Sequence, residues 1–215
     1  RLSSWNHCAN IQTQYGTREQ DPHGDPGWMI WDPDALWSKV CQCISEVVAK
    51  VGGGGGIRAI ACTGFGTDGL PLDKAGKPVY PFISWHCGRT VPQRAKMAER
   101  VSDAEAFQIT GYHNYHINTA NRFLWFREHR PDVLAKTHRW LWVQDYVAYK
   151  LSGEFSTECT IASTGMLLDM ANRTWSPRML DACEIDPSIL PKTSEAGTQI
   201  SVVTAKAAAE TGLNP

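Results

Sequence analysis

The stretch of sequence that decides the fold reads Ile57-Arg-Ala-Ile-Ala-Cys-Thr-Gly-Phe-Gly-Thr-Asp-Gly69. Its first six residues, 57–62, are an apolar run of strand length, and the glycine-rich remainder predicts a turn at the end of that strand. Two short apolar segments follow at 70–73 and 79–84, on either side of a turn at 73–78. Such a pair predicts the two arms of a β-hairpin.

A helix is predicted immediately before this strand. Asp32 suits the N-cap and Pro33 the first helical position, and apolar residues follow at helical spacing between 36 and 51. The glycines at 52–56 end that helix. Farther upstream, residues 5–14 are expected to form an edge strand. A helix, a strand and a hairpin in this order indicate an α/β domain with a mixed sheet.

The second half of the chain is predicted to be mainly helical. Ser102 and Glu105 form a capping box, and Gly111 is placed to close the helix that they begin. A helix at 120–129 is expected to stop before Pro131. Further helices are expected at 145–151, after Ser176-Pro177, and at 204–212, with a strand and a turn at 167–175.

The composition is that of a globular protein without a strongly charged partner. Of the 215 residues, 42% are apolar and 20% are charged, and the formal net charge is −1. This length suits one large domain. Nucleic acids and anionic membranes are bound by basic faces, so we expect neither as a partner. No apolar run approaches the roughly 20 residues that a membrane span requires.

The seven cysteines are expected to be reduced thiols in the cytoplasm. Their number is odd and no Cys-x-x-Cys spacing occurs, whereas a secreted disulfide framework favours an even count in a shorter chain. Cys41 and Cys43 stand two apart in a helical pattern, where side chains point to different faces, so a metal site there is disfavoured. His113 and His116 lack a third ligand at a recognisable spacing, and we expect a polar pocket wall there rather than a metal site.

Gly66, Thr67 and Asp68 are the first candidate site residues. In open α/β sheets, ligands bind at the carboxyl ends of strands, where this loop is predicted to lie. The glycine lets a ligand approach the backbone, and Asp68 supplies an acceptor for hydroxyl groups. The same residues are equally compatible with a structural turn, in which glycines adopt positive φ and Asp68 bonds to its own backbone.

Trp85, His86 and Arg89 are the second candidate group, in the segment Ser84-Trp-His-Cys-Gly-Arg-Thr90. An aromatic face packs against the apolar face of a ligand, while imidazole and guanidinium groups donate hydrogen bonds to hydroxyls. Alternatively, Trp85 belongs to the core and Arg89 pairs with a carboxylate. The residues alone leave both interpretations open.

Motifs for several other chemistries are absent from the sequence. The glycines at 52–56 are followed by Ile57-Arg58 rather than by Gly-Lys-Ser/Thr, so they do not form a P-loop. No GxSxG elbow, HExxH motif or dinucleotide-binding fingerprint occurs. From the residues alone the chain is an α/β domain with a polar, aromatic cleft, and its reaction is not identified.

From about residue 27 to the C-terminus, the order and spacing of these segments resemble the N-terminal domain of the FGGY family of carbohydrate kinases. Gly27-Trp28 with Asp32-Pro33 is similar to the family's entry into its first long helix. Residues 57–90 resemble its strand, sugar-contact loop, hairpin and Trp-x-x-x-Arg segment. Further matches are Leu124-Trp125, Asp145-Tyr146, Leu151-Ser-Gly-Glu-Phe155 and Leu168-Asp169.

Within the family, two segments are most similar to the fuculokinases. Residues 65–69 resemble their Phe-Gly-Val-Asp-Gly, and residues 83–90 resemble their Ile-Ser-Trp-Lys-Cys-Pro-Arg-Thr. Cys87 stands where many relatives carry Asp, and Asn118-Thr119 matches the pattern of a third loop. The resemblance therefore implies a ketose acceptor of the L-fuculose type. His86 departs from the lysine of that pattern, so a xylulokinase- or rhamnulokinase-type specificity stays open.

The resemblance implies an actin-like, ribonuclease H-like fold with a mixed sheet and an added helical region, in which two domains close over ATP, Mg²⁺ and a sugar. It identifies residues 1–215 as the sugar-binding N-terminal domain, incomplete at both ends. The phosphate-binding turn, the catalytic aspartate and the nucleotide-binding domain are then expected outside this chain. Neither a catalytic residue nor a metal ligand is expected within it, and ATP would be bound through the missing domain.

The resemblance assigns three walls to a sugar pocket. They are Gly66, Thr67 and Asp68; Trp85, His86 and Arg89; and Asn118 and Thr119. Asp68 is expected to accept hydrogen bonds from the sugar hydroxyls, and Trp85 to stack on the carbon face of the sugar.

A homodimer is among the assemblies that the resemblance allows. The rival interpretation is a non-catalytic sugar-binding or regulatory module that has lost its ATPase half.

Overall fold

The computed structural model describes residues 28–215, so the strand predicted at 5–14 lies outside the described part. The helices are α2 (Pro33–Lys50), α3 (Val91–Arg100), α4 (Asp103–Thr110), α5 (Thr119–His129), α6 (Pro131–Lys136), α7 (Val143–Ser152), α8 (Cys159–Thr164), α9 (Pro177–Cys183) and α10 (Ala205–Thr211). The strands are β1 (Ile30–Trp31), β2 (Gly69–Leu72), β3 (Phe82–Ile83), β4 (Arg139–Trp142), β5 (Ser156–Glu158), β6 (Leu168–Asp169), β7 (Thr174–Trp175) and β8 (Lys192–Ser194).

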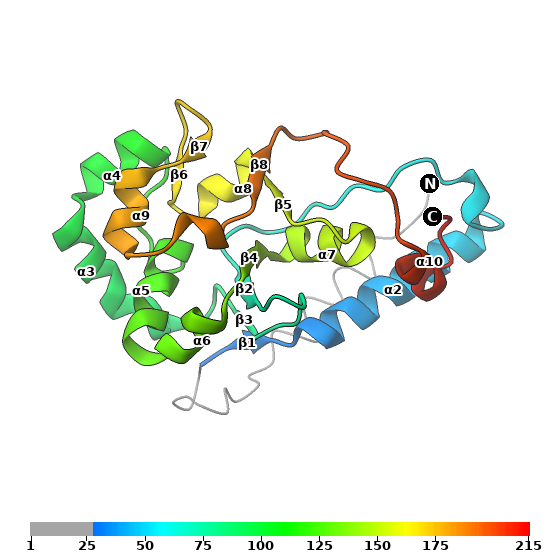
Figure 1. The fold of residues 1–215 in the computed structure, drawn as a ribbon, viewed down its shortest axis with the longest axis horizontal. Coiled ribbons are helices and arrows are strands. Elements are labelled where there is room, and N and C mark those ends of the chain that lie inside the picture. Colours follow the sequence, from blue (N-terminus) through cyan, green and yellow to red (C-terminus); the bar gives the residue numbers. More distant parts are fainter. Residues whose placement is uncertain (1–27) are drawn as a thin grey trace.

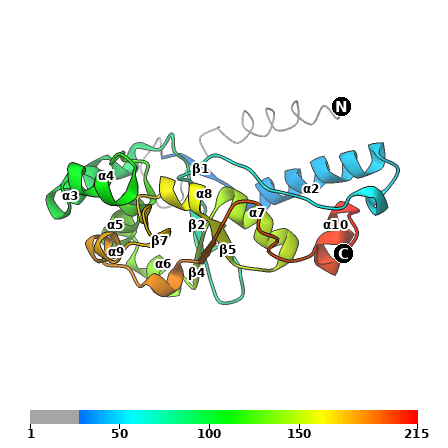
Figure 2. The same ribbon diagram turned by 90° about the horizontal axis from the view of Figure 1, so that it is seen from above.

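The described chain forms an elongated body with helices at both ends (Figure 1). Helices α3, α4, α5 and α9 gather at one end, and α2 and α10 lie together at the other, as two perpendicular views agree (Figures 1 and 2). The short strands and α7 lie between these two groups. The predicted α/β class is therefore confirmed, with both helices and strands in the described part.

The helix boundaries follow the predicted caps. The Asp32 carboxylate accepts a hydrogen bond from the backbone N–H of Asp34 at 2.8 Å and begins α2, with Pro33 at the first helical position. Gly111 and Gly212 close α4 and α10 with φ values of 66° and 76°, in the left-handed region that favours glycine. These local predictions are confirmed.

The strands pair differently from the predicted hairpin. β2 pairs antiparallel with β4, with Gly69 opposite Trp142, while β3 pairs with β1. The predicted turn is present, since the Asp73 carboxylate accepts from the backbone N–H of Lys77, but only an isolated bridge joins the two expected arms. The hairpin prediction is therefore confirmed next to the turn, where the Val79 N–H donates to the Pro71 carbonyl at 2.9 Å. Farther from the turn the second arm continues into β3, which pairs with β1, while β2 pairs with β4.

Residues 57–62 do not form the predicted strand. They run as an extended segment without a ladder partner among the described residues, and Ile60 is 41% exposed. A strand is defined by hydrogen bonds to a neighbour, so apolar character alone does not produce one. The strands β1 to β8 make four pairs in the described part. β5 and β8 are parallel, and the remaining three pairs are antiparallel.

The aromatic core lies at the end formed by α3, α4, α5 and α9, and it supports the candidate loops. Trp125, Trp140, Trp142, Phe123 and Phe126 are each at most 2% exposed and belong to one cluster. The Phe123 and Trp140 rings lie 4.8 Å apart, so helix α5 packs directly against strand β4. This contact places the first turn of α5 next to the loop that precedes β2.

The described part contains no helix long and apolar enough to cross a membrane.

Candidate functional site

The first predicted loop ends in a tight turn centred on Thr67. The backbone N–H of Asp68 donates to the carbonyl of Gly66 at 2.9 Å, and Thr67 has a φ of 72°. This is a γ-turn with a positive central φ, a rare and strained form. The turn packs on α8: the backbone N–H of Thr67 donates to Thr164 Oγ1 at 2.9 Å. A Cβ at Gly66 would lie only 2.4 Å from the same oxygen, so only glycine fits there without a shift.

Asp68 is fully buried, and protein groups bond to its carboxylate. Arg122 Nη2 donates to Oδ1 at 2.7 Å, and Trp31 Nε1 donates to Oδ2 at 3.0 Å. Burial raises the pKa of the Asp68 carboxyl, and the charge and hydrogen bonds of Arg122 oppose that rise. The carboxylate therefore fixes the turn from inside and has no exposed surface in this structure.

The third predicted loop meets the first through direct hydrogen bonds. Thr119 Oγ1 donates to the carbonyl of Thr67 at 3.2 Å and accepts from Trp142 Nε1 at 3.1 Å. Asn118 Nδ2 donates to the carbonyl of Thr164 at 2.8 Å, so both loops bond to the end of α8. Asn118 and Thr119 have no exposed surface, and their polar groups connect loops rather than facing solvent.

Trp85 and His86 are the exposed members of the predicted set. The Trp85 side chain is 37% exposed, and its ring centroid lies 3.6 Å from that of His86. The backbone N–H of Trp85 donates to the Asp68 carboxylate. The second loop therefore touches the first through its backbone and directs two adjacent rings outward.

Arg89 takes part in the core rather than in an exposed pocket wall. Its guanidinium lies 4.3 Å from the Trp28 ring centroid and 5.0 Å from that of Trp125, and Nη1 donates to the Tyr80 hydroxyl at 2.8 Å. Stacking between indole rings suits a guanidinium, which is weakly hydrated and planar. Aromatic rings thus surround the guanidinium, and Arg89 is only 5% exposed.

Arg122 and Thr164 bond directly to the candidate loops, and sequence reasoning missed both. Arg122 lies in a predicted helix, where a single arginine normally faces solvent, yet it is 1% exposed. Thr164 stands in the unremarked run Thr160-Ile-Ala-Ser-Thr164. No local pattern marks either residue, because their partners lie far along the chain.

His113, in the third loop, joins an aromatic surface. The rings of His113 and Phe107 stack with centroids 4.8 Å apart, and Tyr115 approaches His113 edge-on. Burial and the nearby charge of Arg122 lower the pKa of His116. Within residues 28–215, no group of three or more His, Cys, Asp or Glu side chains is arranged to hold a metal ion.

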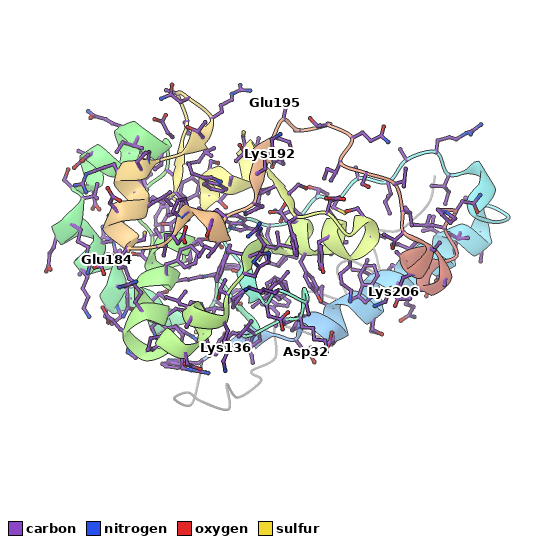
Figure 3. The ribbon with its side chains drawn as sticks, in the orientation of Figure 1. Asp32, Lys136, Glu184, Lys192, Glu195 and Lys206 are labelled. Atoms are coloured by element: carbon purple, nitrogen blue, oxygen red, sulfur yellow. The ribbon has the colours of Figure 1, made fainter. Side chains whose placement is uncertain are left out.

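A cavity of about 860 Å³ lies beside the predicted loops rather than between them. It is bordered by residues 57–63, by α7 and β5, and by the segment after β8, where Glu195 is labelled in Figure 3. Asp145 lines it, and burial raises the pKa of that carboxyl to about 7. None of the eight predicted site residues lines this cavity, although Gln144 on its wall lies close to Gly64, at the start of the first loop.

Three comparisons place these features among known proteins. L-fuculokinase of Escherichia coli (strain K12) is 34% identical over 186 residues, which cover 86% of this chain and 39% of that protein. Autoinducer-2 kinase of Yersinia enterocolitica is 29% identical over 191 residues, covering 87% of this chain and 36% of that protein. The crystal structure of xylulose kinase from Rhodospirillum rubrum matches with a TM-score of 0.83 at 26% identity, over 92% of this chain and 41% of that one.

The likeness to sugar kinases of the actin-like ATPase fold confirms the predicted fold class. The chain spans about two-fifths of the length of the curated relatives that it matches. Residues 4–215 match the sequence model described as "FGGY family of carbohydrate kinases, N-terminal domain". This chain therefore belongs to the FGGY family of carbohydrate kinases.

Proposed function

We propose that this chain is the sugar-binding part of an ATP-dependent carbohydrate kinase that phosphorylates a hydroxyl of a ketose, of the L-fuculose type. Family membership supports the class of reaction, and the L-fuculokinase at 34% identity supports the acceptor. The observation that carries the proposal is the direct bonding of the three predicted loops. Thr67, Asp68 and Thr164 connect all three at one place in the fold.

The eight predicted residues divide into two roles in this proposal. Trp85 offers an exposed aromatic face for the carbon side of a sugar, and His86 offers ring nitrogens for its hydroxyls. Gly66 and Thr67 contribute the backbone of the strained turn. The other four side chains are buried and hold these loops in place: Asp68, Arg89, Asn118 and Thr119.

Transfer of a phosphoryl group depends mainly on positioning and on stabilising the charge of the transferring group. The loops described here would orient the acceptor hydroxyl. Asp68 is unsuited as the general base, because a base must reach the reacting hydroxyl and this carboxylate is paired with Arg122 at 2.7 Å without exposed surface. We propose that the base belongs to a part of the protein outside residues 28–215.

The glycines at 52–56 do not form a P-loop for the phosphates of ATP. Among them, Gly54 packs against the end of α10, where a Cβ would lie 2.5 Å from the carbonyl oxygen of Gly212. This close approach explains glycine there without any phosphate ligand. We propose that ATP and Mg²⁺ are bound mainly by a nucleotide-binding domain outside this chain.

Steady-state kinetics of Trp85→Ala in the full-length protein test the acceptor site. We expect the KM for the sugar to rise about tenfold, equivalent to roughly 1.4 kcal/mol of lost contact, with the KM for ATP unchanged. Phe107→Ala is the matched control, since Phe107 is an exposed aromatic residue (45%) outside the predicted set. Equal changes in both KM values, or the same effect in the control, would refute the assignment of Trp85.

ATP consumption by the intact protein, measured with a panel of acceptors, tests the substrate. L-Fuculose is expected to be the best substrate, and L-rhamnulose, D-xylulose and glycerol are the alternatives. Autoinducer-2 belongs in the panel because a relative at 29% identity is an autoinducer-2 kinase. Sugar binding by calorimetry without ATP turnover would favour the rival, a non-catalytic sugar-binding or regulatory module.

The proposal includes a cytoplasmic location, where thiols such as those of Cys87 and Cys183 stay reduced. It leaves a homodimer open, which light scattering of the intact protein would decide.

A further inference from the structure

The backbone at Thr67 is held in a conformation that its side chain disfavours. Thr67 is β-branched, and its φ of 72° lies in the region that such residues rarely adopt. The hydrogen bond from the Asp68 N–H to the Gly66 carbonyl closes a γ-turn of the strained kind. Strain of this sort persists only where the surroundings enforce it, and it clusters at functional sites.

The guanidinium of Arg122 holds this turn in place through two hydrogen bonds. Arg122 Nη1 donates to the Thr67 carbonyl at 2.6 Å, and Nη2 donates to the Asp68 carboxylate at 2.7 Å. Arg122 is 1% exposed, and its Nε has no partner among the residues that the structure describes. The planar fork of arginine is therefore directed at the turn alone, and its two bonds fix consecutive residues at once.

Stability alone does not account for this pair. A buried ion pair is often no more stabilising than apolar side chains of similar volume, because both charges lose their hydration. Such a pair defines a geometry more strongly than it raises stability when it connects a helix to a strained loop. Helix α5, anchored in the aromatic core by Phe123 and Phe126, supplies a rigid base for Arg122.

We propose that Arg122 is a positioning residue for the acceptor. It holds the Thr67 γ-turn and the Asp68 carboxylate, to which the Trp85 backbone N–H donates, and so fixes the loop that presents the Trp85 and His86 rings to the sugar. This inference rests on the proposed function. Arg122 itself is buried beneath the turn and acts through it. Lysine at this position would keep the charge, but its single ammonium cannot reproduce the two-pronged contact.

Arg122→Lys in the full-length protein tests the proposal through two measurements. Amide hydrogen exchange at residues 66–68 is expected to quicken at least about tenfold, because the turn opens more often. The KM for the sugar is expected to rise about tenfold while the KM for ATP stays constant. Arg178→Lys is the control, since that arginine forms an exposed pair with Glu105 and should change neither measurement.

A second variant separates positioning from stability. In Arg122→Met/Asp68→Asn both charges are removed, while the new amide oxygen still accepts from Trp31 Nε1 and from the Trp85 N–H, so the melting temperature is expected to stay within a few degrees. Faster exchange at Gly66 and Thr67 and a raised sugar KM in this stable variant would support positioning. Unchanged exchange in both variants would overturn it, whatever the protein's activity.

Two further outcomes distinguish this inference from the proposed function. Faster exchange with an unchanged sugar KM would overturn the connection between the turn and the acceptor. Faster exchange in a protein that phosphorylates none of the sugars tested would support the holding role of Arg122 and overturn the kinase proposal.

Discussion

Asp145 is expected to make the stability of this protein fall as the pH rises from 4 to 7. Its side chain lies on α7 at the edge of the 860 Å³ cavity and is 6% exposed. Burial is the largest cause that raises its pKa, and the charge of Glu158 adds to the rise. Burial, and then the charge of Asp145, raises the pKa of the neighbouring Cys62 to about 11. The folded protein therefore favours the protonated carboxyl.

The magnitude follows from the two pKa values of Asp145. Its pKa rises from 3.8 to about 7 on folding, a difference of about 3 units or roughly 4 kcal/mol. Well below pH 3.8 both states carry the proton and the stability is undiminished. Between these pKa values only the unfolded state releases the proton, so the free energy of unfolding falls with rising pH. Above pH 7 both states are ionised and no further loss occurs.

Urea unfolding of the wild type and of Asp145→Asn at pH 5, 6, 7 and 8 measures this effect. Relative to the variant, the wild type is expected to lose about 2–3 kcal/mol between pH 5 and pH 8. Asp132→Asn is the control: hydrogen bonding to Arg130 lowers the pKa of that exposed carboxyl to about 2, so it stays ionised throughout this range. Parallel stability curves for wild type and Asp145→Asn would refute the reasoning.

Three substitutions test the local contacts through the free energy of unfolding. Gly66→Ala brings a Cβ within 2.4 Å of Thr164 Oγ1 and is expected to cost about 1–3 kcal/mol in urea unfolding; a neutral result would show that the loop relaxes freely. Ser102→Ala removes the 3.2 Å cap bond to the Glu105 N–H and is expected to cost about 1 kcal/mol, seen as a lower melting temperature. Arg178→Ala breaks an exposed ion pair with Glu105 and is expected to cost at most about 1 kcal/mol; a larger loss in the same assay would contradict its surface character.

The helix boundaries could be predicted because their determinants are local. Asp32 caps α2 through residues two and three positions later, and Ser102 caps α4 through Glu105. Gly111 and Gly212 close their helices by a backbone conformation that depends on one residue. Such interactions form within a single turn, so a short window of sequence contains both partners.

The site was predictable only in part. The three loops do come together, as the contacts of Thr67, Asp68 and Thr119 show. Arg122 escaped notice because a buried arginine has no pattern of its own, and its carboxylate partner is 54 positions away. Asp68 faces a guanidinium rather than a ligand because a buried carboxylate requires hydrogen-bond donors, and Arg122 supplies them.

Strand pairing depended on the tertiary structure for the same reason. The segment at 79–84 is joined to β2 only beside the turn, whereas the full ladder of β2 is made with β4, where Trp140, Leu141 and Trp142 are fully buried. Residues 57–62 have strand composition, but they have no ladder partner in the described part. A helix satisfies its backbone within itself, whereas a strand, like a buried charge, is completed only by residues that folding brings from elsewhere in the chain.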